Sequence, residues 1–272
     1  MSTLTEVFYL RLDCNNCRAE AWVNGVDVSR VDPASCLLAG RPVHEYLLPS
    51  RNHLALIVNP DPYPSTPMKP GEPYLSAPET YATLHLLQGP RGSLPGDPEV
   101  KTLAAIEWRP APGSPVQPPL VLEAEAELPV WFPRWSWLDA TPVTLSADLN
   151  RQVFGVINLL AAALRRGDVT PYMRAAETRF QEVAQAYGLS ADVTRSNFTE
   201  QFQKLSADAK FEISEPALDR MALRLVGGGR VIDCYESNFE PMLRANKLPN
   251  GTTPVRYHTR LAVFGRELRV VR

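Results

Sequence analysis

The sequence predicts a two-part α+β protein, with an antiparallel β-sandwich over residues 1–145 and, over 146–272, helices followed by a curved sheet. Three observations lead to this division. Of the 26 prolines, 21 lie in the first part, and proline is excluded from helix interiors and central strands. The first part has a net charge of -6 and the second of +4. Apolar residues alternate at period two in the first part and recur at helical spacing early in the second.

The first part is expected to consist of short strands joined by loops. Phe8, Leu10 and Leu12 alternate with polar neighbours, as do Ala19 and Val23 further along, and this period is typical of half-buried strands. Further strands are expected at 52–59, 80–88, 101–110 and 118–130. The segments 59–78 and 89–99 are too rich in proline and glycine to be anything but loops. An antiparallel β-sandwich accounts for this pattern.

The second part is expected to begin with three helices. The first starts at Ser146 or Asp148, which are residue types that cap helix N-termini, and ends at Gly167. The second runs from Thr170–Pro171 to Tyr187–Gly188 and the third from Ala191 to Leu205, with Val193, Phe198, Phe202 and Leu205 facing the core. Strands follow at 210–216, in a hairpin over 220–236 that turns at three glycines, and in a hairpin over 255–272 that turns at Phe264–Gly265. Helices followed by a meander of strands indicate an α+β domain.

The composition excludes several classes of function. A formal net charge of -2 leaves no basic excess to neutralise phosphates, so no nucleic-acid partner is expected. The longest uncharged apolar run, "VFGVINLLAAAL", is too short to cross a membrane, and the first residues lack a signal-peptide pattern. We therefore expect a cytoplasmic, non-membrane protein whose four cysteines are reduced.

Motifs of nucleotide, metal and hydrolase chemistry are missing from the sequence. It contains no P-loop, no dinucleotide-binding glycine motif, no H-E-x-x-H helix and no nucleophile elbow. The four histidines, His44, His53, His85 and His258, are scattered without metal-ligand spacing. We expect neither a metal nor a cofactor.

The Cys-x-x-Cys formed by Cys14 and Cys17 is interpreted as structural. A zinc site would need two more ligands close by, and a thioredoxin-like site would need the start of a helix, whereas this pair lies between two strands. Asn15–Asn16 is therefore expected to be a two-residue hairpin turn with the two cysteines facing each other across the ladder. That geometry permits a disulfide without requiring one.

Two stretches of the first part resemble the galactose-binding-like β-sandwich that often precedes sugar-processing domains. These are "AWVNGVDV" and "RPVHEYLLPSRNHLALIVN", within residues 17–60. The resemblance implies the fold and no ligand site.

The second part resembles the NTF2-like α+β domain, which includes SnoaL-type cyclases, in the order of its elements. Catalysts of that family need a polar dyad inside the cone formed by the helices and the bent sheet. The candidates here are Asp233, Tyr235, Tyr257 and His258. Since neighbours on a strand point to opposite faces, Asp233 and Tyr235 can share a face, whereas Tyr257 and His258 cannot.

The stretch "VWFPRWSWLDATP" concentrates tryptophans where the two parts join. In an extended segment Trp131, Trp135 and Trp137 would lie on one face. Exposed, they would form a partner-binding patch, because Trp is a typical interface anchor and its ring also stacks on sugars. Buried, they would hold the two parts together or close the sandwich core.

These observations favour binding over catalysis. The expected partner is another protein, and a bacterial cytoplasmic immunity or accessory protein that blocks a toxin is one such role, because it needs a complementary surface and no active site. The first alternative is a small-molecule enzyme or binder that uses the NTF2-like cavity, with Asp233 or His258 as the base. The second is a carbohydrate-binding module, which the V-N-G resemblance and the tryptophans support.

Overall fold

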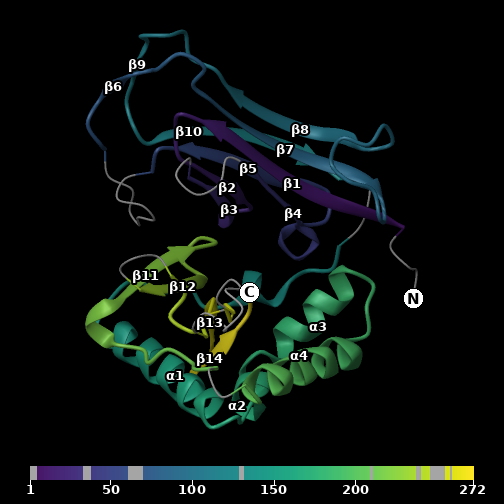
Figure 1. Ribbon diagram of the computed structural model, residues 1–272, viewed down its shortest axis with the longest axis vertical. Coiled ribbons are helices and arrows are strands. Elements are labelled where there is room, and N and C mark those ends of the chain that lie inside the picture. The colour runs from purple at the N-terminus through teal and green to yellow at the C-terminus, as the bar shows by residue number, and fades with distance from the viewer. Residues whose placement is uncertain are drawn as a thin grey trace. The chain divides into compact units, whose positions relative to one another are not determined.

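Figure 1 shows the computed structural model of the chain, which describes residues 5–32, 38–60, 70–128, 132–208, 211–236, 240–245, 255–257 and 259–272. These residues form a mixed α+β protein in which all paired strands are antiparallel. The chain divides into two compact units, Met1–Arg134 (unit 1) and Trp135–Arg272 (unit 2).

Unit 1 is built from strands in two four-stranded sheets and one small two-stranded sheet. The strand order is β4-β1-β7-β8 in the first sheet and β10-β5-β2-β3 in the second, and β6 pairs with β9. The strands are β1 Glu6–Asn15, β2 Ala19–Val23, β3 Val26–Val31, β4 Leu38–Pro42, β5 Arg51–Val58, β6 Tyr74–Leu75, β7 Tyr81–Pro90, β8 Lys101–Trp108, β9 Pro115–Val116 and β10 Leu120–Glu127.

The period-two pattern of the sequence accounts for the core of unit 1. In β1 the side chains of Phe8, Leu10 and Leu12 are fully buried, while their neighbours along the strand are partly exposed. In β5 of the other sheet, Leu54 and Leu56 are also fully buried. Both sheets therefore contribute a row of apolar side chains to the core.

The predicted hairpin between β1 and β2 is wrong, because the two strands lie in different sheets. β1 pairs with β4 and β7, whereas β2 pairs with β3 and β5. Asn16 has the positive φ of a turn residue, 54°, but its turn carries the chain from one sheet to the other. The tight turn lies at Asn24–Gly25, with φ of 51° and 75°, where Asn-Gly suits a two-residue hairpin better than Asn-Asn does.

Unit 2 begins with its helices. They are α1 Ala147–Arg165, α2 Thr170–Ala175, α3 Glu177–Ala186 and α4 Ala191–Ser206. Ser146 caps α1, and its hydroxyl accepts the backbone N–H of Leu149 at 3.0 Å. The predicted helix over residues 170–187 is divided into α2 and α3 at Ala176, where φ is -99° and ψ is 11°.

The sheet of unit 2 has the order β11-β12-β13-β14. Its strands are β11 Met221–Val226, β12 Val231–Glu236, β13 Leu261–Phe264 and β14 Glu267–Val270. The predicted turn of the first hairpin is confirmed, since Gly227, Gly228 and Gly229 all have positive φ. The strand predicted at 210–216 is reduced to a single bridge between Ile213 and Ala245.

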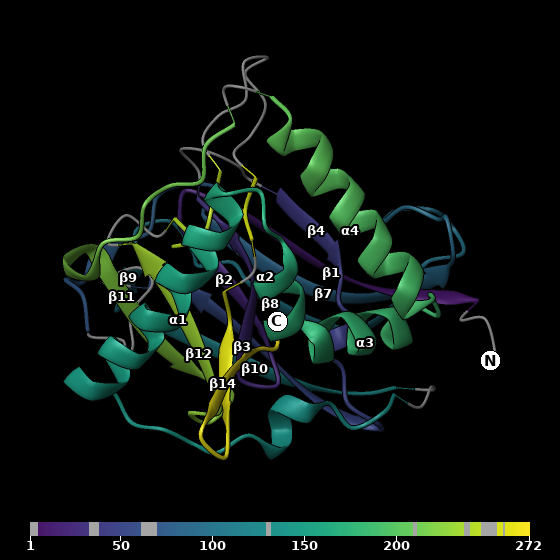
Figure 2. The same cartoon turned by 90° about the horizontal axis from the view of Figure 1, so that it is seen from below.

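The space between the helices and the sheet of unit 2 is filled by apolar side chains. From the helices it receives Leu149, Val153, Ile157, Leu160, Leu164, Tyr172, Phe180 and Phe202, and from the sheet and its flanking segments Ile232, Cys234, Tyr257, Leu261 and Val270. Figure 2 shows α1, α2 and α3 gathered around β14. Val193 was expected to face this core, but it is 56% exposed.

The boundary between the units precedes the predicted one at residue 145. Residues 135–145 belong to unit 2 because their backbone bonds to it: the N–H of Thr141 donates to Val263 O at 2.9 Å, and that of Val143 donates to Gly229 O at 2.9 Å. The predicted boundary lies later in the chain because it was placed where prolines become rare, and that change follows Pro142.

Candidate functional site

Asp233 and Tyr235, the predicted catalytic candidates, lie together on β12. The hydroxyl of Tyr235 donates to Asp233 Oδ2 at 3.1 Å, so the two side chains share a face of the sheet, as strand alternation predicts. Two arginines complete the cluster: Arg260 Nε lies 2.5 Å from Asp233 Oδ1, and Arg224, the cross-strand partner of Asp233, reaches Oδ2 at 3.4 Å.

This cluster lies on the other face of the sheet from the helices. The β12 residues that pack against the helices are Ile232 and Cys234, and Asp233 alternates with them. The expectation that Asp233 points into the cone is therefore wrong. Because Asp233 is buried and its carboxylate accepts hydrogen bonds from two arginines and from Tyr235, the arrangement is that of a structural ion-pair network.

The other predicted residues do not complete an active site. His258 lies outside the described residues, as does Trp131. Tyr257 belongs to the apolar core, where its ring meets the edges of neighbouring aromatic rings. Burial raises the pKa of its hydroxyl, which has no hydrogen-bond partner among the residues that the structure describes.

Trp135 and Trp137 are buried, with exposed fractions of 0% and 2%. The guanidinium carbon of Arg272 lies 5.4 Å from the centroid of the Trp135 ring, and Arg272 in turn pairs with Glu182 at 2.6 Å. The ring of Trp137 lies against the turn between β11 and β12, where a Cβ added at Gly227 would be 3.0 Å from its nearest atom. A buried indole cannot stack on a sugar or anchor a partner, so these two residues serve packing in this structure.

Cys14 and Cys17 are both free thiols and both buried. The thiol of Cys14 donates to the carbonyl of Cys17 at 3.0 Å, and that of Cys17 to the carbonyl of Tyr81 at 3.2 Å. The interaction with Cys14, together with burial, raises the pKa of Cys17. No group of three or more metal-ligating side chains occurs within the described ranges.

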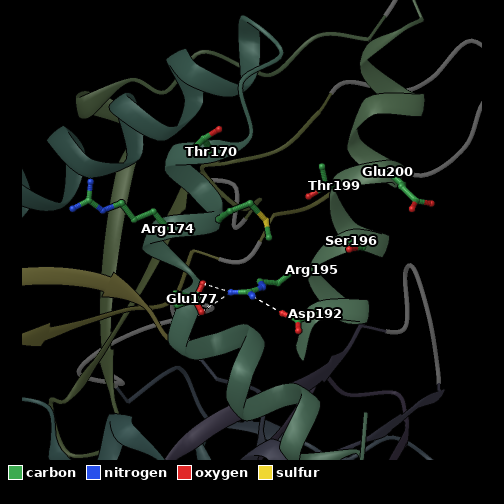
Figure 3. Close-up of a pocket in the computed structure, with 9 residues that line it drawn as sticks. Thr170, Arg174, Glu177, Asp192, Arg195, Ser196, Thr199 and Glu200 are labelled. Atoms are coloured by element: carbon green, nitrogen blue, oxygen red, sulfur yellow. Dashed lines mark hydrogen bonds and ion pairs between the residues drawn. The ribbon is translucent and has the colours of Figure 1, made fainter. Parts of the chain in front are cut away.

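The hollowed surfaces of unit 2 lie between its helices. One of them, the α2–α4 groove, has a volume of about 520 Å³ and is shown in Figure 3. It is lined by Thr170, Met173, Arg174, Glu177, Asp192, Arg195, Ser196, Thr199 and Glu200. Most of these side chains are charged or carry a hydroxyl.

An ion-pair network holds one end of the α2–α4 groove. Arg195 donates from Nη1 to both oxygens of Glu177, at 2.6 and 2.7 Å, and from Nη2 to Asp192 at 2.6 Å. The hydrogen bonds to Asp192 and Glu177 raise the pKa of Arg195. Since Glu177 begins α3 and Arg195 lies on α4, this network ties the two helices together (Figure 3).

A second hollow, the α1–β14 groove, has a volume of about 540 Å³ and is lined by more residues with apolar side chains. Its apolar residues are Val156, Leu159, Leu160, Pro171, Ala175 and Leu268, and its polar ones are Asp168, Thr170, Arg174, Glu267 and Arg269. Leu159 is 59% exposed. An exposed leucine beside a concave surface that is lined by apolar residues is a feature of protein interfaces.

The charges around the α1–β14 groove are balanced, since two acidic and two basic side chains line it. The backbone N–H of Thr170 lowers the pKa of Asp168, and a hydrogen bond from Arg269 lowers that of Glu267. Arg174 lines both grooves, is exposed, and makes no hydrogen bond or salt bridge within the described part of the chain. Figure 3 shows its side chain pointing away from the pair of Glu177 and Arg195.

Neither groove was predicted from the sequence. The sequence contained one signal of the α1–β14 groove, which is Leu159. The apolar stripe that α1 buries consists of Val153, Ile157, Leu160 and Leu164, and Leu159 lies outside it and is exposed. The partners of Leu159 in the groove come from α2 and β14, far along the chain, which spacing within α1 does not reveal.

No family model, curated protein or solved structure matches the chain. None of the described helices is both long enough and apolar enough to span a membrane.

Proposed function

We propose that the protein is a non-catalytic binding protein that engages another protein through the α1–β14 groove and the adjoining α2–α4 groove. The observation that carries this proposal is Leu159, which is 59% exposed beside a groove with an apolar floor. Interfaces typically combine an apolar centre with a polar rim in which arginine is enriched. The two grooves together have this composition.

The partner is expected to insert an apolar side chain beside Leu159 and to present a carboxylate to Arg174. Arg174 lies where the two grooves meet, and its charge contributes, after that of Arg269, to lowering the pKa of Glu267. When Arg174 is counted, the two acidic and two basic residues of the α1–β14 groove balance, so the partner need not be strongly charged overall. An immunity or accessory protein that blocks a bacterial toxin is one role that uses such a surface.

The alternative of an enzyme in the NTF2-like cavity has less support. The space between helices and sheet is occupied by apolar side chains, and the carboxylate of Asp233 is bonded to arginines on the other face. The order of helices and strands supports an NTF2-like fold for unit 2, and two sheets that share a core support a β-sandwich for unit 1.

The test is affinity capture from a lysate of the native host, followed by quantitative mass spectrometry, with matched variants. Leu159→Asp and Arg174→Glu alter the groove, and Leu218→Asp alters a leucine that is 45% exposed and lines neither groove. We expect one protein to be enriched with wild type and with Leu218→Asp, and lost with both groove variants.

Circular dichroism must show that every variant is folded as the wild type is. A protein that Leu159→Asp captures as well as the wild type does would show that the grooves are not the docking surface. Turnover of a substrate by the purified chain, abolished by Asp233→Asn, would replace the proposal with the enzyme alternative.

A further inference from the structure

A third hollow of unit 2 has a different character from the two grooves. It lies between α3, α4 and residues 255–257, with a volume of about 220 Å³, and shares no lining residue with either groove. Its apolar walls come from Phe198, Phe202, Leu205 and Val255. The ring of Tyr257 adds to them, edge-on to those of Phe198 and Phe202.

Arg179 and Arg256 line this cavity, and they differ in whether they form an ion pair with another described residue. Arg256 forms a two-pronged pair with Glu240, from Nε at 3.2 Å and from Nη2 at 3.1 Å, so its charge is neutralised. Arg179 makes no ion pair in the described part of the chain, and its Nε is buried without a hydrogen-bond partner. Its guanidinium carbon lies 5.7 Å from the centroid of the Phe180 ring, which provides no acceptor.

We propose that this cavity binds a small monoanion with an apolar body, of the class of aryl carboxylates, with Arg179 as the counter-charge. A partly buried guanidinium without a counter-ion is suited to a carboxylate, with which it forms charge-assisted, often two-pronged hydrogen bonds. The aromatic walls supply the surface that an apolar ring needs to leave water.

The size of the cavity sets the size of the ligand. Apolar cavities of about 150 Å³ hold a benzene ring, so 220 Å³ accommodates one ring and a carboxylate. The site therefore differs in kind from the protein-docking grooves and does not depend on the function proposed for them.

The experiment titrates the full chain with phenylacetate and, in parallel, with phenylacetamide, which has the same ring and no charge. Two-dimensional NMR or calorimetry measures the binding. For phenylacetate we expect saturable binding with a Kd on the order of 1 mM or tighter, which is typical of so small a ligand. Phenylacetamide should bind at least about tenfold more weakly, because it cannot pair with Arg179.

Arg179→Gln should weaken phenylacetate binding at least about tenfold and leave the weak binding of phenylacetamide unchanged. Arg151→Gln is the matched control, since it removes an exposed arginine of unit 2 that lines none of the three hollows, and it should change neither affinity. Equal binding of acid and amide, no effect of Arg179→Gln, or no saturable binding up to about ten times the expected Kd would each overturn the proposal.

Discussion

Tyr257→Phe should stabilise the protein, although it removes a polar group from a buried tyrosine. The hydroxyl of Tyr257 is buried and has no hydrogen-bond partner among the described residues, and the side chain as a whole is 4% exposed. A buried hydroxyl without a partner costs about 1–3 kcal/mol. The void left by one oxygen atom offsets this by a few tenths of a kcal/mol, at about 24 cal/mol per Å³. The expected net gain in the free energy of unfolding is about 1–2 kcal/mol.

The assay is urea denaturation followed by circular dichroism, supported by thermal unfolding, in which unit 2 should melt about 2–8 °C higher. Tyr235→Phe is the matched control, because it is the same substitution on a hydroxyl that donates to Asp233 at 3.1 Å. It should cost about 1–3 kcal/mol, since that bond is made to a charged acceptor. Destabilisation by Tyr257→Phe of more than about 1 kcal/mol would refute the reasoning, because it would mean that the hydroxyl has a partner.

The same hydroxyl gives a dependence on pH with a definite sign. Burial raises the pKa of Tyr257 above that of the unfolded chain, which is about 10. Above that pH the unfolded state loses the proton while the folded state keeps it, so the free energy of unfolding falls as pH rises. Between about pH 9 and pH 11, Tyr257→Phe should lose less stability than the wild type. Equal slopes for the two proteins would contradict the burial of this group.

Other predictions follow from capping, ion pairing and the thiols. Ser146→Ala should cost about 1 kcal/mol in urea denaturation, because it removes the N-cap of α1; no loss would show that the cap is dispensable. Glu182→Gln should cost about 3–5 kcal/mol, because it removes the negative charge that pairs with the buried guanidinium of Arg272 at 2.6 Å; a cost below about 1 kcal/mol would argue against a strong contribution of that pair. Chelators and reductants should leave the circular dichroism spectrum unchanged, since Cys14 and Cys17 are free thiols; unfolding by either reagent would indicate a metal or a disulfide.

The local elements could be predicted because their causes lie within a few residues. Alternation along residues 8–12 anticipates the buried face of β1, Ser146 anticipates the start of α1, and three consecutive glycines anticipate the turn after β11. Each of these signals acts through the backbone or through side chains one turn away.

The pairing of strands could not be predicted in the same way. Cys14 and Cys17 flank Asn15 and Asn16, which both suit a hairpin turn. The next strand, β2, nevertheless belongs to the other sheet, because β1 pairs with β7. The sequence also did not show whether Asp233 faces the helices. The alternation of side chains along a strand places Asp233 and Tyr235 on one face of the sheet, but it does not tell which face the helices cover. Neither groove was predictable, because each is formed by elements whose meeting depends on the complete fold.

The strand order of unit 1 also bears on how the chain folds. The central pair of the first sheet aligns Glu6 with Pro90 and Asn15 with Tyr81, so a long stretch of chain must be brought back before any of its ladder forms. In unit 2, by contrast, α1 to α4 and the tight hairpins form from neighbouring residues. Because local contacts form faster than distant ones, unit 2 should acquire protected amide protons first during refolding, and the first sheet of unit 1 should set the slow phase.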